Sequence, residues 1–207
     1  MTPSAPSVRK VVLAAAGISL AITLLRFFGE REAWNPQFFS RQPGGGGALL
    51  GITWLVLPFG FWFGRCLAKN GQRPSTTGKA LLLHVIGIAI VAAVFFASFK
   101  VTDDWRLRGY ISNAGAVAAG LLALVAWRSA WFTLVGYGLL ARIPVIVVQY
   151  LSVTNGWDNH FAKGPPGSDP ADVLFLLTMA QSFFWPFGFT TLVGGVFAIL
   201  GAATVRR

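Results

Sequence analysis

The sequence is poor in charge and in the residue types that most catalytic sites use. Of its 207 residues only 12% are charged, and acids are the scarcest, with 7 Asp and Glu against 17 Lys and Arg. There is one cysteine, Cys66, and there are two histidines. A single cysteine excludes an intrachain disulfide, and so few His and Cys residues leave no clustered metal-ligand set. We therefore predict no metal site and no cofactor.

Catalytic signatures are missing as well. The sequence contains no G-x-S-x-G, no H-E-x-x-H and no P-loop. The only acid and imidazole close together are Asp158 and His160, in a polar stretch expected to be an outer loop. They are weak catalytic candidates, because a solvated turn explains them more simply.

Apolar residues are abundant: 55% of the chain is hydrophobic and its mean hydropathy is +0.63. Stretches of about 20 apolar residues are long enough to cross the hydrocarbon core of a bilayer as helices. The predicted spans are 11–28, 48–63, 80–99, 110–127, 131–152 and 173–205. We expect an all-α, polytopic integral membrane bundle of about six transmembrane helices, forming one domain over 1–207 with no soluble domain. Proline and glycine predict kinks in spans two, five and six.

The last apolar run is longer than a span requires. As a straight helix, 173–205 is about 50 Å long, against a hydrocarbon core of about 30 Å. Pro186 and Gly188 interrupt it. One kinked, tilted helix and a re-entrant first half both remain open from the sequence.

The net charge of +10 is unevenly distributed between the predicted loops. One side carries nine cations and no acid, whereas the other carries seven of each. The nine cations are Arg9, Lys10, Arg65, Lys69, Arg73, Lys79, Arg128, Arg206 and Arg207. Basic loops face the cytoplasm, so both termini are predicted there, with the plasma membrane (a bacterial inner membrane) as location. The excess charge indicates topology and contact with the lipid bilayer, not nucleic-acid binding.

Arg142 is the most unusual residue of the chain. It lies in the middle of 131–152, roughly 15 Å from either end of that span. A cation at this depth costs about 2.5–3.5 kcal/mol on insertion scales and needs polar surroundings. Two residues later Pro144 has no amide hydrogen, which frees the Leu140 carbonyl. Every acidic residue is assigned to an outer loop or a helix start, so we expect neutral partners, a deep-reaching acid, another chain or an anionic ligand.

Two polar stripes are predicted to meet at this depth. Gly138, Arg142 and Gln149 share one face of span five. The first half of span six carries a second stripe, which begins roughly 10 Å below the outer surface and can lie level with Arg142. The predicted ligand-binding residues are Arg142, Gln149, Gln181, Ser182 and Thr178.

A second candidate anion site lies before span two. Backbone amides of a glycine run at a helix start, next to a cation, can hold a phosphate or carboxylate. A flexible linker is the plainer interpretation. The residues are Arg41, Gly44, Gly45, Gly46 and Gly47.

Three function classes follow. The first is a small transporter or channel in which Arg142 meets an anionic or polar ligand, a small molecule or a lipid. The second is an accessory or assembly subunit that packs against another membrane protein or a second copy of itself. The third is an intramembrane enzyme that acts on lipid or quinone-like substrates through its outer loops. No catalytic motif supports the third class, so enzymatic activity is not favoured.

Overall fold

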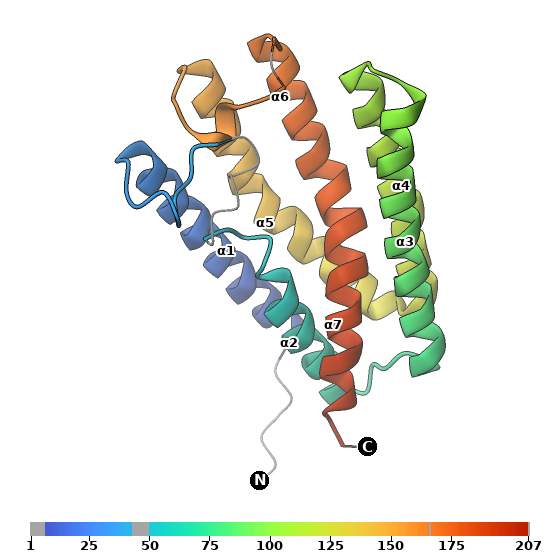
Figure 1. The fold of residues 1–207 in the computed structure, drawn as a ribbon. Helices are drawn as coiled ribbons and strands as arrows, with labels where there is room; N and C mark the ends of the chain where they lie inside the picture. The colour runs from blue at the N-terminus through green and yellow to red at the C-terminus, as the bar shows by residue number, and fades with distance from the viewer. Residues whose placement is uncertain (1–6, 43–49, 166, 207) are drawn as a thin grey trace.

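The computed structural model describes residues 7–42, 50–165 and 167–206, and this part of the chain contains helices and no strand. Among the described residues, five helical segments are long and apolar enough to cross a bilayer: α1, α3, α4, α5 and the continuous rod from α6 to α7. The protein is therefore a membrane-embedded helical bundle, which confirms the predicted all-α class (Figure 1). In chain order the elements are α1 (Val8–Arg31), α2 (Val56–Lys69), α3 (Thr77–Val101), α4 (Trp105–Ala126), α5 (Arg128–Thr154), the short 3₁₀-helix η2 (His160–Ala162), α6 (Pro170–Met179), η3 (Ala180–Thr190) and α7 (Thr191–Ala203).

The second helix differs from its prediction. Span two was expected at 48–63, but α2 begins at Val56 and ends at Lys69. Its 14 residues measure roughly 21 Å, shorter than the hydrocarbon core. Pro58 lies in its first turn, where a missing amide hydrogen costs no intrahelical bond, so this proline belongs to a helix start and not to an interruption. Residues 50–55 before it form an irregular, turn-containing segment.

The last apolar run is one unbroken helical rod from Pro170 to Ala203, 34 residues long. Its middle part, η3, is π-helical and contains Pro186. A π-helix has a wider turn than an α-helix and is frequent at functional sites. Of the two interpretations left open by the sequence, the structure has the single long helix, and the rod's excess length is accommodated without a re-entrant loop.

Helix α2 packs along α7 through glycines. At Gly60 an added Cβ would stand 2.5 Å from the Gly194 carbonyl oxygen, closer than real Cβ contacts. At Gly64 it would overlap the backbone of Ala198. Small residues at these positions let the two backbones approach closely, which is how membrane helices gain van der Waals contact. This packing fixes α2, and with it the irregular segment 50–55, against the rest of the bundle.

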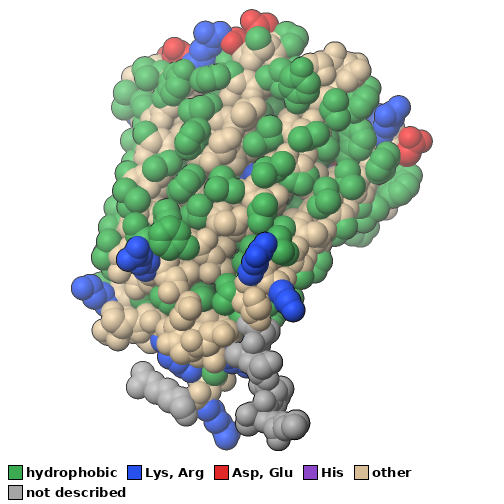
Figure 2. Space-filling view, turned by 180° about the vertical axis from the view of Figure 1, so that it is seen from behind, with side chains coloured by type: hydrophobic (Ala, Val, Ile, Leu, Met, Phe, Trp, Pro, Cys, Tyr) green, Lys and Arg blue, Asp and Glu red, His purple; other side chains and the backbone are tan. Residues whose placement is uncertain are grey.

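Charged side chains gather at the two ends of the bundle. On the face shown in Figure 2, the acidic side chains lie at the upper end, the lower end carries Lys and Arg, and the band between them is mainly hydrophobic. The first turn of α1 and the last turn of α7 lie at the same, basic end (Figure 1).

Candidate functional site

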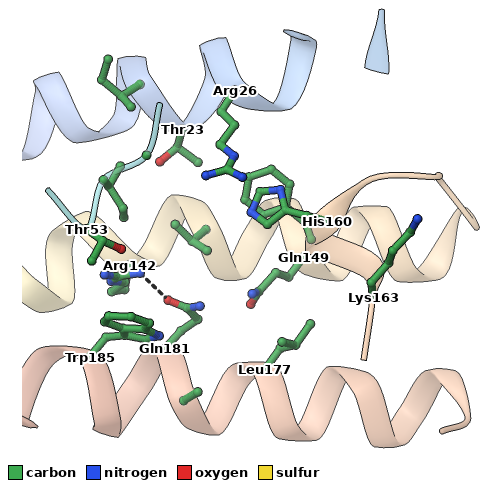
Figure 3. A pocket seen from close by; sticks show the side chains of 16 residues that line it. Thr23, Arg26, Thr53, Arg142, Gln149, His160, Lys163, Leu177, Gln181 and Trp185 are labelled. Atoms are coloured by element: carbon green, nitrogen blue, oxygen red, sulfur yellow. Dashed lines mark hydrogen bonds between the residues drawn. The ribbon is translucent and has the colours of Figure 1, made fainter. Parts of the chain in front are cut away.

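Arg142 lies in the middle of α5 and is buried, with 6% of its surface exposed. Its Nη1 donates a hydrogen bond of 2.9 Å to Oε1 of Gln181 in η3 (Figure 3). The guanidinium also lies over the ring of Trp185, 4.6 Å from the ring centroid, in cation–π geometry. Both partners come from the π-helical segment, so η3 provides the neutral surroundings that this charge needs.

A cavity of about 290 Å³ adjoins Arg142. Its walls come from α1, the irregular segment 50–55, α5, η2 and the rod (Figure 3). Most of its polar lining converges from different elements, as is usual for a small-molecule site. The polar side chains that line it are those of Thr23, Arg26, Thr53, Arg142, Gln149, His160, Lys163 and Gln181.

Two polar groups at this cavity, on Arg142 and Gln149, lack a full set of partners. Within the described part of the chain, no carboxylate lies within ion-pair distance of Arg142. Gln149, one of the lining residues, is 4% exposed, and its Oε1 has no hydrogen-bond partner among the described residues. Burying a polar atom without a hydrogen-bond partner costs free energy. The Arg142 guanidinium and the Gln149 Oε1 are therefore positions at which a bound molecule gains a contact.

The predicted polar stripes are only partly brought together. Gly138, Arg142 and Gln149 are all buried, as expected for one inward face of α5. On the rod, Gln181 lines the cavity, but Thr178 and Ser182 are absent from its wall. Gln181 and Trp185, four positions apart in the π-helical segment η3, both line the cavity, so only part of the predicted stripe lies on that side of the rod.

The sequence analysis did not predict the lining residues Thr23, Arg26, Thr53, Lys163 and Trp185. It also misplaced Glu30, which lies beside the cavity and contacts two of its lining residues, Arg26 and His160. Glu30 was assigned to an outer loop, yet it lies in the last turn of α1 and its side chain is fully buried. Its carboxylate accepts hydrogen bonds from Arg26 Nε at 2.8 Å and from His160, through the backbone amide at 2.9 Å and Nδ1 at 2.7 Å. The i, i+4 spacing of Arg26 and Glu30 on a helix was the available signal.

The predicted pair of Asp158 and His160 is not formed. Asp158 is exposed over 67% of its side chain and pairs with Lys163 at 2.9 Å and Arg41 at 3.5 Å, whereas His160 turns inward to Glu30. The hydrogen bond and charge of Lys163, followed by the charge of Arg41, lower the pKa of Asp158. An acid held ionised among cations is a structural ion pair and gives His160 no catalytic partner.

His160 lies at the outer end of the cavity. Burial lowers its pKa below 6.5, and the nearby charge of Arg26 acts in the same direction, while the hydrogen bond with Glu30 opposes both. The neutral ring donates from Nδ1 to the carboxylate, which already has Arg26 as its counter-ion. Arg26, Glu30 and His160 thus tie α1 to the loop after α5, beside the cavity that Arg26 and His160 line.

The second candidate anion site gains little support. The Arg41 guanidinium is engaged by the protein itself, donating from Nε to the Glu30 carbonyl at 2.6 Å and from Nη2 to the Arg31 carbonyl at 3.0 Å. The glycines Gly44, Gly45, Gly46 and Gly47 lie outside the described residues. Within those residues, no group of three His, Cys, Asp or Glu side chains is placed to hold a metal ion.

Comparison with known proteins adds no assignment. No protein-family model matches the chain, and neither the curated proteins nor the solved structures yield a match.

Proposed function

We propose that this protein is a small transporter or channel-like protein that binds an anionic or polar molecule beside Arg142. The observation that carries the proposal is the cavity next to a buried guanidinium whose hydrogen-bond partner, Gln181, is neutral. An arginine that served only to tie helices together would be enclosed by acceptors and would face no open volume. Kept charged and without a counter-ion in the described chain, Arg142 favours a ligand that supplies negative charge.

The side chains around the cavity define the chemistry of the ligand. Trp185 covers one face of the Arg142 guanidinium, so a ligand approaches in the guanidinium plane, where a carboxylate or phosphate accepts two parallel hydrogen bonds. The Gln149 amide oxygen accepts a hydrogen bond from the same ligand. A small anion that also carries a hydroxyl or amino group therefore fits better than a bare inorganic ion.

The fold favours six crossings of the membrane. The first turn of α1 and the last turn of α7 lie at the same end, which requires an even number of crossings, and five long helices provide an odd number. We propose that the irregular segment 50–55 and α2 together complete the sixth. Non-helical backbone is tolerated at membrane depth where it lines a cavity, and residues 51–53 do line one. The basic end is the cytoplasmic one under this proposal, in a bacterial inner membrane.

Reporter fusions test the topology. Fusions after Gly71 and after the C-terminus should both report the cytoplasm, and a fusion after Asn155 should report the opposite side. A fusion after Gln42, between α1 and α2, should also report the opposite side. If it reports the same side as the Gly71 fusion, the chain does not cross between them and the sixth crossing is wrong.

Uptake into proteoliposomes tests the function. Wild-type protein should accumulate at least one member of a panel of small hydroxy and amino carboxylates, and Arg142→Gln should abolish uptake while the variant remains folded. Arg142→Lys retains the charge but not the planar geometry and should transport with lower apparent affinity. Equal uptake by wild type and folded Arg142→Gln would instead support a structural role for Arg142 and an accessory function for the protein.

A further inference from the structure

A second hollow region lies on the other side of Trp185 from the Arg142 cavity. Two adjoining hollows, of about 370 and 490 Å³, share walls at Phe95, Phe184 and Trp185. They run between α3 and α4 on one side and the rod on the other, and we call them together the α3 groove. The lower hollow is lined wholly by apolar residues and glycine. The upper hollow adds polar groups near the outer end of the bundle, among them Arg108.

The groove has the length of one lipid leaflet. On α3 it extends from Phe99 in the upper hollow to Ile88 in the lower one. These residues are 11 positions apart, which is roughly 16 Å along a helix, and half of a hydrocarbon core of about 30 Å is roughly 15 Å. An acyl chain of a lipid in the outer-end leaflet would therefore reach from the headgroup level to the bottom of the groove.

The upper end of the groove carries an incompletely satisfied cation. Arg108 lies in the first turns of α4, with its guanidinium 5.0 Å from the Phe99 ring centroid. Its Nη2 donates to the Asp103 carbonyl at 2.6 Å. Its Nε is buried and has no hydrogen-bond partner among the described residues. The Asp103 carboxylate is 3.9 Å away and fully exposed, so it neutralises Arg108 only weakly.

The neighbouring side chains fit the headgroup level of a membrane. Trp105 lines the upper hollow, and tryptophan is enriched at the membrane–water interface. The nearby cation Arg106 is already paired with Asp172 from the rod. Arg108 is thus the cation of this groove that has a donor to offer to an incoming oxygen atom.

We propose that the α3 groove binds a phospholipid of the outer-end leaflet, with one acyl chain between α3 and the rod and the headgroup phosphate accepting a hydrogen bond from Arg108. A phospholipid fits the groove at both ends. Its phosphate complements the charge of Arg108, and its acyl chain matches the apolar wall below, which has the length of one leaflet. A chain without a phosphate would leave the Arg108 Nε unsatisfied. The site is separate from the Arg142 cavity, although Trp185 forms a wall of both.

Native mass spectrometry of the purified full chain tests the site. Phosphatidylglycerol and diacylglycerol with identical acyl chains are compared, because the second lacks the anionic phosphoglycerol headgroup. The wild type should bind phosphatidylglycerol about tenfold more tightly, the size expected of one charge-assisted hydrogen bond. Arg108→Gln should reduce this preference to near equality.

A matched pair of substitutions tests the apolar part. Ala92 lines the lower hollow on α3, and its neighbour Ala93 is exposed without lining it. Ala92→Trp should fill the groove and lower binding of both lipids about tenfold or more, whereas Ala93→Trp should bind them as the wild type does. Equal binding by the two tryptophan variants, or an unchanged phosphate preference in Arg108→Gln, would overturn the proposal. Since both alanines lie on the exposed surface of α3, the pair remains informative even if Arg108→Gln fails to fold.

Discussion

Glu30 and His160 are 130 positions apart in the chain, and the imidazole Nδ1 lies 2.7 Å from the carboxylate Oε2. This contact joins the end of α1 to the loop that follows α5 at the rim of the Arg142 cavity. Because the carboxylate is also held by Arg26, its negative charge is balanced without a proton on His160. The neutral histidine makes this junction sensitive to pH.

The first prediction concerns that pH dependence. The folded-state pKa of His160 is lowered from 6.5, so the unfolded chain binds a proton more readily than the folded one. Stability from this residue is complete above pH 6.5 and is lost as the pH falls below it toward the folded-state pKa. Thermal unfolding from about pH 8 to about pH 5 should show a falling Tm in the wild type. His160→Gln should remove this part of the pH dependence; an unchanged slope would contradict the assignment.

The second prediction concerns the buried carboxylate. Glu30→Gln removes the counter-ion of Arg26 and should lower the free energy of unfolding by about 1–3 kcal/mol, because a buried charge loses its charge-assisted partner. Glu32→Gln is the matched control: Glu32 is exposed just beyond the same helix, and its change should stay within about 0.5 kcal/mol. Unfolding in a denaturing-detergent titration measures both. Equal effects in the two variants would show that the buried carboxylate has no special role.

The third prediction concerns the packing of α2 on α7. Gly64→Ala places a methyl group against the Ala198 backbone and should destabilise the protein by about 1–3 kcal/mol. Gly17→Ala in α1 meets no atom within 4 Å and should be neutral or slightly stabilising. Tm values of the two variants provide the comparison. A Gly64→Ala protein as stable as Gly17→Ala would mean that the close approach of α2 and α7 does not exist.

The fourth prediction concerns the π-helical segment. The Phe184 backbone amide donates to Oδ1 of the buried Asn113 on α4 at 3.0 Å, which satisfies an amide within the altered helical turn. Asn113→Ala leaves that amide without its acceptor and should cost about 1–3 kcal/mol. Leu121→Ala, on the exposed face of α4, should cost less. Amide hydrogen exchange around Phe184 should be faster in Asn113→Ala than in Leu121→Ala. Equal exchange rates there in the two variants would contradict the role of Asn113.

The sequence predicts much of the fold because membrane spans follow from apolar length. The four long helices α1, α3, α4 and α5 were expected within a few residues of their observed limits. Span two was misplaced because its apolar run continues through residues 50–55, where the chain is irregular, and hydropathy does not distinguish the two conformations. The sequence also did not predict the π-helical conformation of η3, because this conformation depends on how the rod packs against α4 and α5.

The sequence predicts only part of the candidate site. A charge in the middle of an apolar run identifies Arg142 directly, and the expected depth of the rod brought Gln181 level with it. Glu30 was missed because it stands between charged neighbours at a helix end, where a solvated position is the ordinary expectation. Only the tertiary contact with His160 shows that it is buried.

The irregular segment 50–55 has a mechanical consequence for the Arg142 cavity. The helices α1 and α5 and the rod form the other long walls, and displacing any of them disrupts a packed bundle. At residues 51–53 the wall is a short stretch of turns, anchored above by the Leu50 carbonyl, which accepts from Arg26 at 2.8 Å, and below by α2. If the cavity admits a molecule, opening it on this side displaces turns and not a packed helix, and the residue that fastens its upper edge is the same Arg26 that balances Glu30.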